Sequence, residues 1–527
     1  MFGKVNPRGR LSIITITEEY FMTLRRPSRS DILNISESTH VHLTEHELSV
    51  VEQMIADNLV HYDVLDQIPE VIQTNVAAIR IPGSRPTREH DPFNAIVRTC
   101  DVRSAAPIEG SLSGMTIGVK DTICVAGIPT TCGSKLLYDY VPDVDAPIVS
   151  RIINAGGHIT AMLNTDDFAF SGAGHTSTYG PGLNPRNAKH VAGGSSCGSA
   201  IAVATGQVDI AIGGDQGGSI RIPASWSGIV GHKPTHGLVP YSGIAGYDLT
   251  LDHIGPMAKN VESVALMLSA IAGKDEAWSD PRQPDSIEKV DYTAALSGSL
   301  RGLRIAVVEE GFNTPWSMPQ VNEAVREAIK LLEHLGATVQ SISVPEHNHV
   351  VPIWNSIATE GGIDTFFHGL NAYGTKAWYN TRQMSAMSKA IKSNASDFSP
   401  TAKVSVMVAH YMKEQYHGVY YGRARNLARQ LTTVYDEVFK RFDLVVMPTT
   451  PQTAHEVPPM PEVDRAAHIS QALNMLCNTA AFNLTGHPSI SVPCKDVVGL
   501  PVGLMFTGRY FDDATVLRAA HAYQIAQ

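Results

Sequence analysis

Short apolar runs alternate with amphipathic stretches along most of this chain. Runs typical of buried strands occur at residues 115–119, 158–163, 208–212, 303–308, 339–344 and 444–447. Helical spacing of apolar residues lies between several of them, at 146–155, from 201 onward and at 321–335. This β-α-β order predicts an α/β fold, with a large mixed, mostly parallel β-sheet flanked by helices.

The same pattern suggests how the chain is divided. Residues 45–68 carry apolar positions at helical spacing, and a polar, proline-containing stretch follows at 83–91. We therefore expect an N-terminal tail and helical segment over residues 1–90 and a main domain over 91–527. Within that domain, residues 354–427 are helical in pattern and rich in Tyr, Met and His, so they could form a cap.

Composition and charge narrow the class of protein. The 527 residues are 43% hydrophobic and 17% charged, which is typical of a globular protein. The net charge of −10 disfavours nucleic acid and anionic membranes as partners, and no apolar run is long enough to span a bilayer. Six cysteines without a Cys-x-x-Cys pair favour a reduced, cytoplasmic protein. The basic start of the chain, Lys4 to Thr17, is interpreted as a tail rather than a signal peptide.

Three short segments carry residues suited to chemistry. Lys120 ends a predicted buried strand, where an unpaired ammonium is costly. Residues 193–200 (GGSSCGSA) lead into a predicted helix, whose N-terminus favours negative charge. Residues 213–223 (GGDQGGSIRIP) form a glycine-rich turn that can aim several backbone N–H groups at one point, as an oxyanion hole does. Phosphate binding is less favoured, because neither a Walker A run nor G-x-G-x-x-G is present.

Each segment alone also fits a surface turn or a helix cap, but together and in this order they resemble the amidase signature family. Further matching runs are GVKD at 118–121, GHKPT at 231–235, GLVP at 237–240, LDHIGP at 251–256, MPTTP at 447–451, GHPS at 486–489 and GLPVG at 499–503. The resemblance covers about residues 90 to 527 and is closest to the nitrile-pathway amidases. One departure is Cys197, where the family more often has Gly; its thiol could be open to alkylation.

The resemblance implies an amidase that cuts amide-type bonds without a cofactor or metal. Ser219 matches the nucleophile, Lys120 the catalytic lysine, and Ser195 the serine that follows a cis peptide bond. Gln216, Gly217 and Gly218, with Ser219, match the backbone donors of the oxyanion hole. The residues implied to line the acyl pocket are Phe168, Phe170, Ser171 and Gly172. A homodimer is also implied.

The expected chemistry depends on an uncharged lysine. A serine hydroxyl needs a positioned base, and lysine acts as one near neutral pH only when burial lowers its pKa from about 10.4. Lys120 would then take a proton from Ser195, which takes one from Ser219. Asp215 and Arg221 flank the nucleophile and are interpreted as charges that hold the turn.

Other functions stay open at this stage. Residues 194–198 also satisfy G-x-S-x-G, which would make Ser196 the nucleophile of an α/β-hydrolase esterase. The histidines at 232, 236, 253 and 487 do not follow a zinc-binding spacing and are interpreted as structural or pocket-lining. The chain could instead serve as the catalytic subunit of a tRNA-dependent amidotransferase. For a free enzyme we expect small carboxamides or carbamates as substrates.

Overall fold

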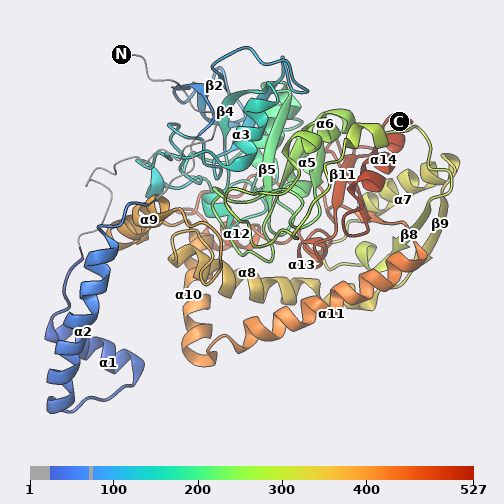
Figure 1. The fold of residues 1–527 in the computed structure, drawn as a ribbon. Helices are drawn as coiled ribbons and strands as arrows, with labels where there is room; N and C mark the ends of the chain where they lie inside the picture. The colour runs from blue at the N-terminus through green and yellow to red at the C-terminus, as the bar shows by residue number, and fades with distance from the viewer. Residues whose placement is uncertain (1–23, 71–74) are drawn as a thin grey trace, which may run out of the picture. The chain divides into compact units, whose positions relative to one another are not determined.

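A single mixed β-sheet runs through the main body of the chain (Figure 1). The computed structural model describes residues 24–70 and 75–527, so the predicted N-terminal tail at Lys4 to Thr17 lies outside the described residues. The strands are β1 (Ala78–Pro82), β2 (Ile96–Ser104), β3 (Thr116–Lys120), β4 (His158–Leu163), β5 (Ile210–Asp215), β6 (Val230–Lys233), β7 (His253–Ala258), β8 (Arg304–Val308), β9 (Thr338–Ile342), β10 (Leu444–Pro448), β11 (Ser489–Pro493) and β12 (Gly503–Gly508). Their order across the sheet is β1-β2-β4-β3-β5-β7-β6-β11-β12-β10-β8-β9.

The α/β class and the mixed sheet are confirmed, but the expectation of a mostly parallel sheet is wrong. In the described residues, β3 pairs in parallel with β4 and β5, and β8 with β9 and β10. The other seven neighbouring pairs are antiparallel. Strands buried on both faces are continuously apolar whichever way they run, so the sequence pattern does not reveal their direction.

The helices of the main body include some that cover the two faces of the sheet and others that lie beyond it (Figure 1). They are α3 (Pro147–Asn154), α4 (Cys197–Thr205), α5 (Arg221–Ser227), α6 (Val261–Ile271), α7 (Pro319–His334), α8 (Val350–Phe367), α9 (Thr381–Asn394), α10 (Pro400–Tyr416), α11 (Val419–Arg441), α12 (Arg465–Ser470), α13 (Ala481–Leu484) and α14 (Asp513–Gln524). Strand β5 shows the two-sided burial: Ile210 and Ile212 join one apolar cluster with residues of α6, while Ala211 joins another with residues of α4. Alternate side chains of a strand point to opposite faces, so β5 is held between two apolar cores.

The predicted cap region is helical and extends past its expected limits. Helices α8 and α11 contact each other over much of their length (Figure 1). Phe366 on α8, Met387 on α9 and Ala402 on α10 share a third apolar cluster with Phe168 and Phe170 of the main body. This cluster ties the helical region to the segment after β4, which carries part of the candidate site.

The N-terminal residues form a separate unit, Met1–Thr74, while Asn75–Gln527 form the second. In the first unit, α1 (Arg29–Thr39) and α2 (Glu45–Leu65) each begin at a capping box, with Ser28 and Thr44 as N-caps. The boundary lies earlier than the expected position near residue 90. The reason is that β1 pairs with β2 and so makes residues 78–82 the first strand of the sheet.

Candidate active site

Three parallel strands bring distant residues together at one edge of the sheet. Strand β3 lies between β4 and β5 and runs parallel to both. Lys120 is the last residue of β3, Asp166 follows β4, and the turn at 216–219 follows β5. Because the carboxyl ends of parallel strands meet at the same edge, this is where α/β proteins usually bind ligands.

Lys120 and Ser195 form a buried pair. The Lys120 Nζ lies 2.6 Å from Ser195 Oγ, and the two residues are 1% and 0% exposed. Ser195 lies in the loop before α4, and the peptide bond between Gly194 and Ser195 is cis. The structure thus places two of the three predicted catalytic residues in direct contact.

Burial changes the proton affinity of the lysine. It lowers the pKa of Lys120 to about 8, because removal from water disfavours the ammonium form, and the nearby Asp166 carboxylate opposes this effect. Asp166 is itself buried and accepts hydrogen bonds from the Gly174 and Thr176 amides and the Thr176 hydroxyl, at 2.8–2.9 Å. Burial also raises the pKa of Asp166. At mildly alkaline pH a large fraction of Lys120 is therefore uncharged, which is the form that acts as a base.

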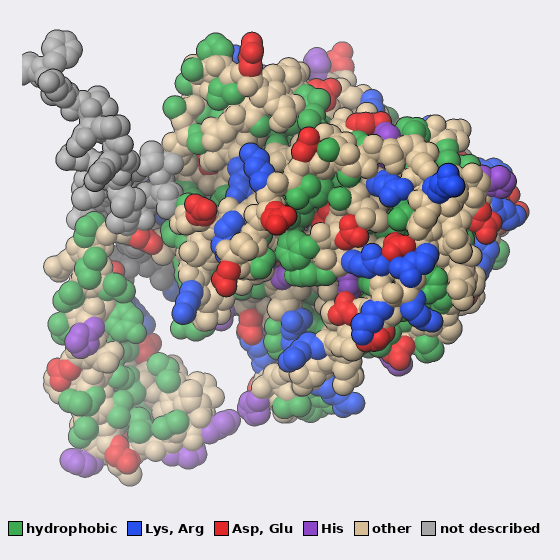
Figure 2. All heavy atoms as spheres, turned by 45° about the vertical axis from the view of Figure 1, so that its right-hand side comes forward, with side chains coloured by type: hydrophobic (Ala, Val, Ile, Leu, Met, Phe, Trp, Pro, Cys, Tyr) green, Lys and Arg blue, Asp and Glu red, His purple; other side chains and the backbone are tan. Residues whose placement is uncertain are grey.

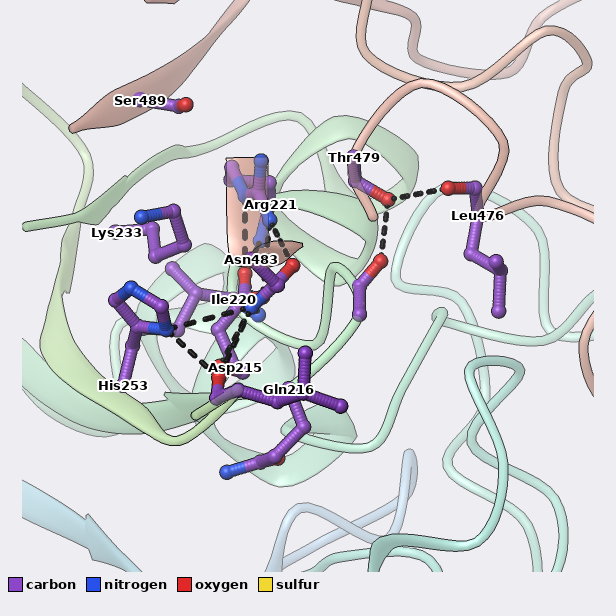
Figure 3. A network of polar contacts seen from close by, with 12 residues as sticks. Asp215, Gln216, Ile220, Arg221, Lys233, His253, Leu476, Thr479, Asn483 and Ser489 are labelled. Carbon is purple, nitrogen blue, oxygen red and sulfur yellow. Dashed lines mark hydrogen bonds and ion pairs between the residues drawn. The ribbon is translucent and has the colours of Figure 1, made fainter. Parts of the chain in front are cut away.

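A buried ion pair braces the turn that carries Ser219. Arg221 donates from Nη2 and Nε to the two carboxylate oxygens of Asp215, each at 3.0 Å, and both side chains are fully buried. Asn483 accepts from Arg221 at 2.7 Å and donates to the Asp215 carboxylate at 2.9 Å, as Figure 3 shows. The Ile220 amide also donates to Asp215, at 3.1 Å. Asp215 and Arg221 thus hold the ends of the turn together.

Ser219 borders a cavity, and concave sites of this kind are where small molecules bind. Phe170, Ser171 and Gly172 line the same cavity, together with Gln216 and Gly217. Side chains from elsewhere complete it: Ile222, Tyr247, Trp354, Ala358, Leu473 and Leu476 are apolar or aromatic, and Asn355, Thr359 and Ser405 are polar. Within the described residues, Ser219 Oγ has no hydrogen-bond partner.

Phe168, also predicted to line the pocket, faces another space. It lines a neighbouring cavity with Lys120 and Tyr241. Its ring packs edge-on against Phe366, with centroids 4.8 Å apart. The two cavities share Ala169, Gln216 and Tyr247 as lining residues. Phe168 therefore belongs to the wall behind Lys120 rather than to the space beside Ser219.

Two other predictions from the serine-rich loop change with the structure. The Ser196 hydroxyl donates to the Gly214 carbonyl at 3.1 Å and accepts from the Gly214 amide at 3.2 Å, and the residue is fully buried. Its hydroxyl is thus engaged in linking the loop to β5, which argues against a nucleophile. The Cys197 thiol is also fully buried, and burial raises its pKa, so the expected openness to alkylation is wrong.

Sequence reasoning missed three residues around the turn. Trp354 Nε1 donates to the Gln216 carbonyl at 2.7 Å, and Thr479 Oγ1 donates to the Gly217 carbonyl at 2.6 Å. The Asn483 amide donates to the Asp215 carbonyl at 2.9 Å. None of the three lies near the turn in sequence, and each occurs in an unremarkable stretch, so no local pattern marks them.

Comparison with known proteins agrees with this geometry. The Amidase family model matches residues 94–517. The chain belongs to the amidase family. It is an amide-hydrolysing enzyme with the amidase signature fold.

The relatives of this amidase include other amidases and an amidotransferase subunit. It is 41% identical over 443 residues to an enantioselective amidase of Rhodococcus rhodochrous, covering 82% of this chain and 84% of that one. It is 40% identical to a glutamyl-tRNA(Gln) amidotransferase subunit of Exiguobacterium sibiricum, covering 79% and 84%. Among solved structures, the peptide amidase of Stenotrophomonas maltophilia aligns with a TM-score of 0.65 and 30% identity, covering 79% and 83%.

Proposed function

We propose that this amidase hydrolyses small, uncharged carboxamides through an acyl-enzyme on Ser219, with Lys120 and Ser195 as its proton relay. The observation that carries the proposal is the buried 2.6 Å contact between Lys120 Nζ and Ser195 Oγ, at the sheet edge that also carries Ser219. A lysine that is buried and bonded to a hydroxyl, with its pKa lowered, has the properties of a general base.

The reaction begins when Ser219 Oγ attacks the amide carbon. The Ser219 proton passes to Ser195, and the Ser195 proton passes to uncharged Lys120. The carbonyl oxygen becomes an oxyanion near the N–H groups of the 216–219 turn. When the C–N bond breaks, the relay returns the proton to the leaving nitrogen. Water then attacks the acyl-enzyme by the same route and releases the carboxylic acid.

Ser219 and Ser195 must move closer for this relay to operate. Their hydroxyls share no hydrogen bond in the described residues, whereas the Lys120–Ser195 contact is already made. Catalytic hydrogen bonds are often long or unmade without substrate and tighten in the complex. We therefore expect a rotation of the Ser219 side chain when an amide occupies the cavity.

The lining of the Ser219 cavity supports an uncharged acyl group. None of the residues that line it carries a formal charge, and most are apolar or aromatic. A charged substrate would lose its hydration there without gaining a partner, which is costly. Aliphatic and aromatic amides fit this lining, and carbamates, which share the carbonyl chemistry, are the next candidates.

Catalytic action within an amidotransferase complex is the second candidate, because this chain is also 40% identical to a glutamyl-tRNA(Gln) amidotransferase subunit. In that role the substrate would be an amide donor such as glutamine, whose α-ammonium and α-carboxylate each need a partner. The uncharged cavity lining disfavours such a donor. Copurification with other subunits and a requirement for them in activity would favour this second function.

A substrate panel tests the proposal. Purified enzyme is offered benzamide, a short aliphatic amide, a phenyl carbamate and glutamine, with hydroxylamine present to trap the acyl group as a hydroxamate. We expect hydroxamate from the uncharged amides, little from glutamine, and none from Ser219→Ala. Ser196→Ala is the matched control and keeps its activity. Turnover of glutamine alone would contradict the proposed substrate class, and activity in Ser219→Ala would contradict the nucleophile.

A homodimer stays a prediction, and the N-terminal unit supports it. Its two helices bury only Ile32 and Leu48, and they expose many large apolar side chains: Leu33, Ile35, Val50, Met54, Val60, Tyr62, Val64 and Leu65 (Figure 2). Exposed apolar patches of this kind mark protein contacts, and a second copy would cover them.

Location also stays a prediction. The cytoplasmic assignment comes from the cysteine content, and all six cysteines are free thiols in the structure. Within residues 24–70 and 75–527, no helix combines the length and the apolar character that crossing a membrane requires.

A further inference from the structure

The turn that carries Ser219 has its carbonyl groups occupied from outside the turn. Trp354 donates to the carbonyl of Gln216, and Thr479 donates to the carbonyl of Gly217. The next carbonyl, that of Gly218, accepts from the Ile222 amide at 2.7 Å. Three successive peptide groups are thus held by their oxygen atoms.

The N–H groups of the same three peptides are left without partners. In the described residues, the amides of Gly217, Gly218 and Ser219 donate to no acceptor. Their peptide bonds are trans, so each N–H points opposite to the carbonyl of the same peptide. A donor that holds the Gln216 or Gly217 carbonyl therefore also sets the direction of the Gly217 or Gly218 N–H.

Both donors are rigidly placed. Trp354 is 5% exposed and Thr479 fully buried. The Trp354 ring packs on Gly217, where an added Cβ would lie only 2.7 Å from ring atom Cζ2. At Gly218, whose φ is +143°, an added Cβ would lie 2.3 Å from Thr479 Oγ1. The two side chains fill the space behind the turn, so the turn cannot rotate its peptides without displacing them.

We propose that Trp354 and Thr479 are positioning residues for the oxyanion hole. This inference rests on the proposed function, because it assumes that the oxyanion forms against the Gly217 and Gly218 amides. Trp354 holds the first peptide from helix α8 of the cap, and Thr479 holds the second from the segment before α13.

Trp354 has a second contact that makes the arrangement sensitive to the substrate. Its side chain lines the Ser219 cavity while its Nε1 binds the Gln216 carbonyl. An acyl group that packs on the indole ring therefore presses on the side chain that aims the Gly217 N–H. Substrates whose acyl groups are too small to touch Trp354 should therefore have a lower kcat with a smaller change in KM, because correct placement of the ring matters in the transition state.

Two substitutions remove the donors while keeping the shapes. Trp354→Phe deletes the indole N–H and keeps an aromatic ring, and Thr479→Val deletes only the hydroxyl. Loss of one oxyanion donor costs about 10²- to 10³-fold in kcat. A donor that is misaimed rather than lost should cost less, so we expect roughly a 10- to 100-fold fall in kcat for each variant, with KM changed less than about threefold.

Matched variants control for loss of packing. Thr479→Ser restores the hydroxyl and should recover most of the activity. Trp378 is the control for the tryptophan, because its Nε1 is buried without a partner in the described residues. Trp378→Phe should therefore leave kcat unchanged. Melting temperatures of all four variants show whether any loss of activity follows a loss of folding.

The deciding readout compares a tetrahedral adduct with an uncharged ligand that has no carbonyl oxygen. Phenylboronic acid can bond to Ser219 and present an oxyanion, whereas benzyl alcohol presents the same aromatic ring without one. We expect the inhibition constant of phenylboronic acid to rise in Trp354→Phe and Thr479→Val by the same factor that kcat/KM falls, while that of benzyl alcohol stays within about threefold. The reference substrate is the uncharged amide that the wild type cleaves fastest.

The outcomes separate this inference from the proposed function. Unchanged kcat in both variants, or equal weakening of phenylboronic acid and benzyl alcohol, would overturn the positioning role while wild-type turnover still supported the function. If the Ser219→Ala variant still hydrolysed amides, or if the wild type hydrolysed none, the proposed function and this inference would both be overturned.

Discussion

Acidification should inactivate this amidase by protonating Lys120. Burial lowers the pKa of Lys120 to about 8, and the relay needs the uncharged amine. Below that pKa the uncharged fraction falls tenfold per pH unit, so it is about a hundredth at pH 6. We therefore expect kcat/KM for a neutral amide to rise with unit slope between about pH 6 and 7.5 and to level off above about pH 8.5.

The assay is a pH series of initial rates with an uncharged amide, whose own charge does not change over that range. Among the charges that favour the ammonium form of Lys120, the Asp166 carboxylate has the largest effect. The substitution Asp166→Asn removes this charge, so it should lower the pKa of Lys120 further and move the acid limb of the kcat/KM profile to lower pH. Activity that stays constant down to about pH 6, or a limb that moves to higher pH in Asp166→Asn, would refute the base role.

The same shift affects stability. The pKa of Lys120 in the folded state is below its value of about 10.4 in an unfolded chain, so between these values the unfolded chain binds more protons. The Lys120 contribution to the unfolding free energy should therefore be fully present above about pH 10.4 and decrease as pH falls from there to about 8, where it is lost. Denaturant titrations of wild type and Lys120→Met over that range measure the difference in slope.

Three further predictions concern the residues around the relay. Ser196→Ala should keep kcat but lose about 1–3 kcal/mol of stability in urea, because two buried polar groups of Gly214 lose a partner; loss of acylation would reinstate Ser196 as nucleophile. Arg221→Met should cost about 3–5 kcal/mol, since Asp215 would be buried without its cation; equal stability by chemical denaturation would contradict that role. Cys197 should resist iodoacetamide in the native protein and react in urea, as peptide mass mapping would show; native labelling would mean that the loop opens.

The parts of the site that follow strands could be predicted from the sequence. Lys120 ends an apolar run, and the glycine-rich turn follows another, so their placement at a sheet edge follows from the α/β pattern. The same pattern placed six of the twelve strands in the described residues, β3, β4, β5, β8, β9 and β10, and the helices α2, α3, α4 and α7. The assignment of roles to Lys120, Ser195 and Ser219 came from the resemblance to the amidase signature family, because each residue alone fits an ordinary turn.

Contacts between distant segments could not be predicted. Trp354 and Thr479 reach the turn from positions 138 and 262 residues away, and hydrogen bonds of a side chain to a remote carbonyl leave no periodic signal. Phe168 and Phe170 are two positions apart and face different cavities, because Phe168 has a φ of +46° that the pattern does not reveal. The parallel or antiparallel direction of the buried strands could not be predicted for a similar reason, because the partner of each strand comes from a distant segment of the chain.

The central claim is that Ser219 carries the acyl group, and mass spectrometry of the trapped enzyme tests it directly. The enzyme is mixed with a phenyl carbamate whose carbamoyl-enzyme hydrolyses slowly, and the mixture is then quenched in acid and digested. We predict a mass increase equal to the carbamoyl group on the peptide that contains Ser219, and none in Ser219→Ala. A modified peptide containing Ser195 or Ser196 instead, or an acylated Ser219→Ala protein, would contradict the account.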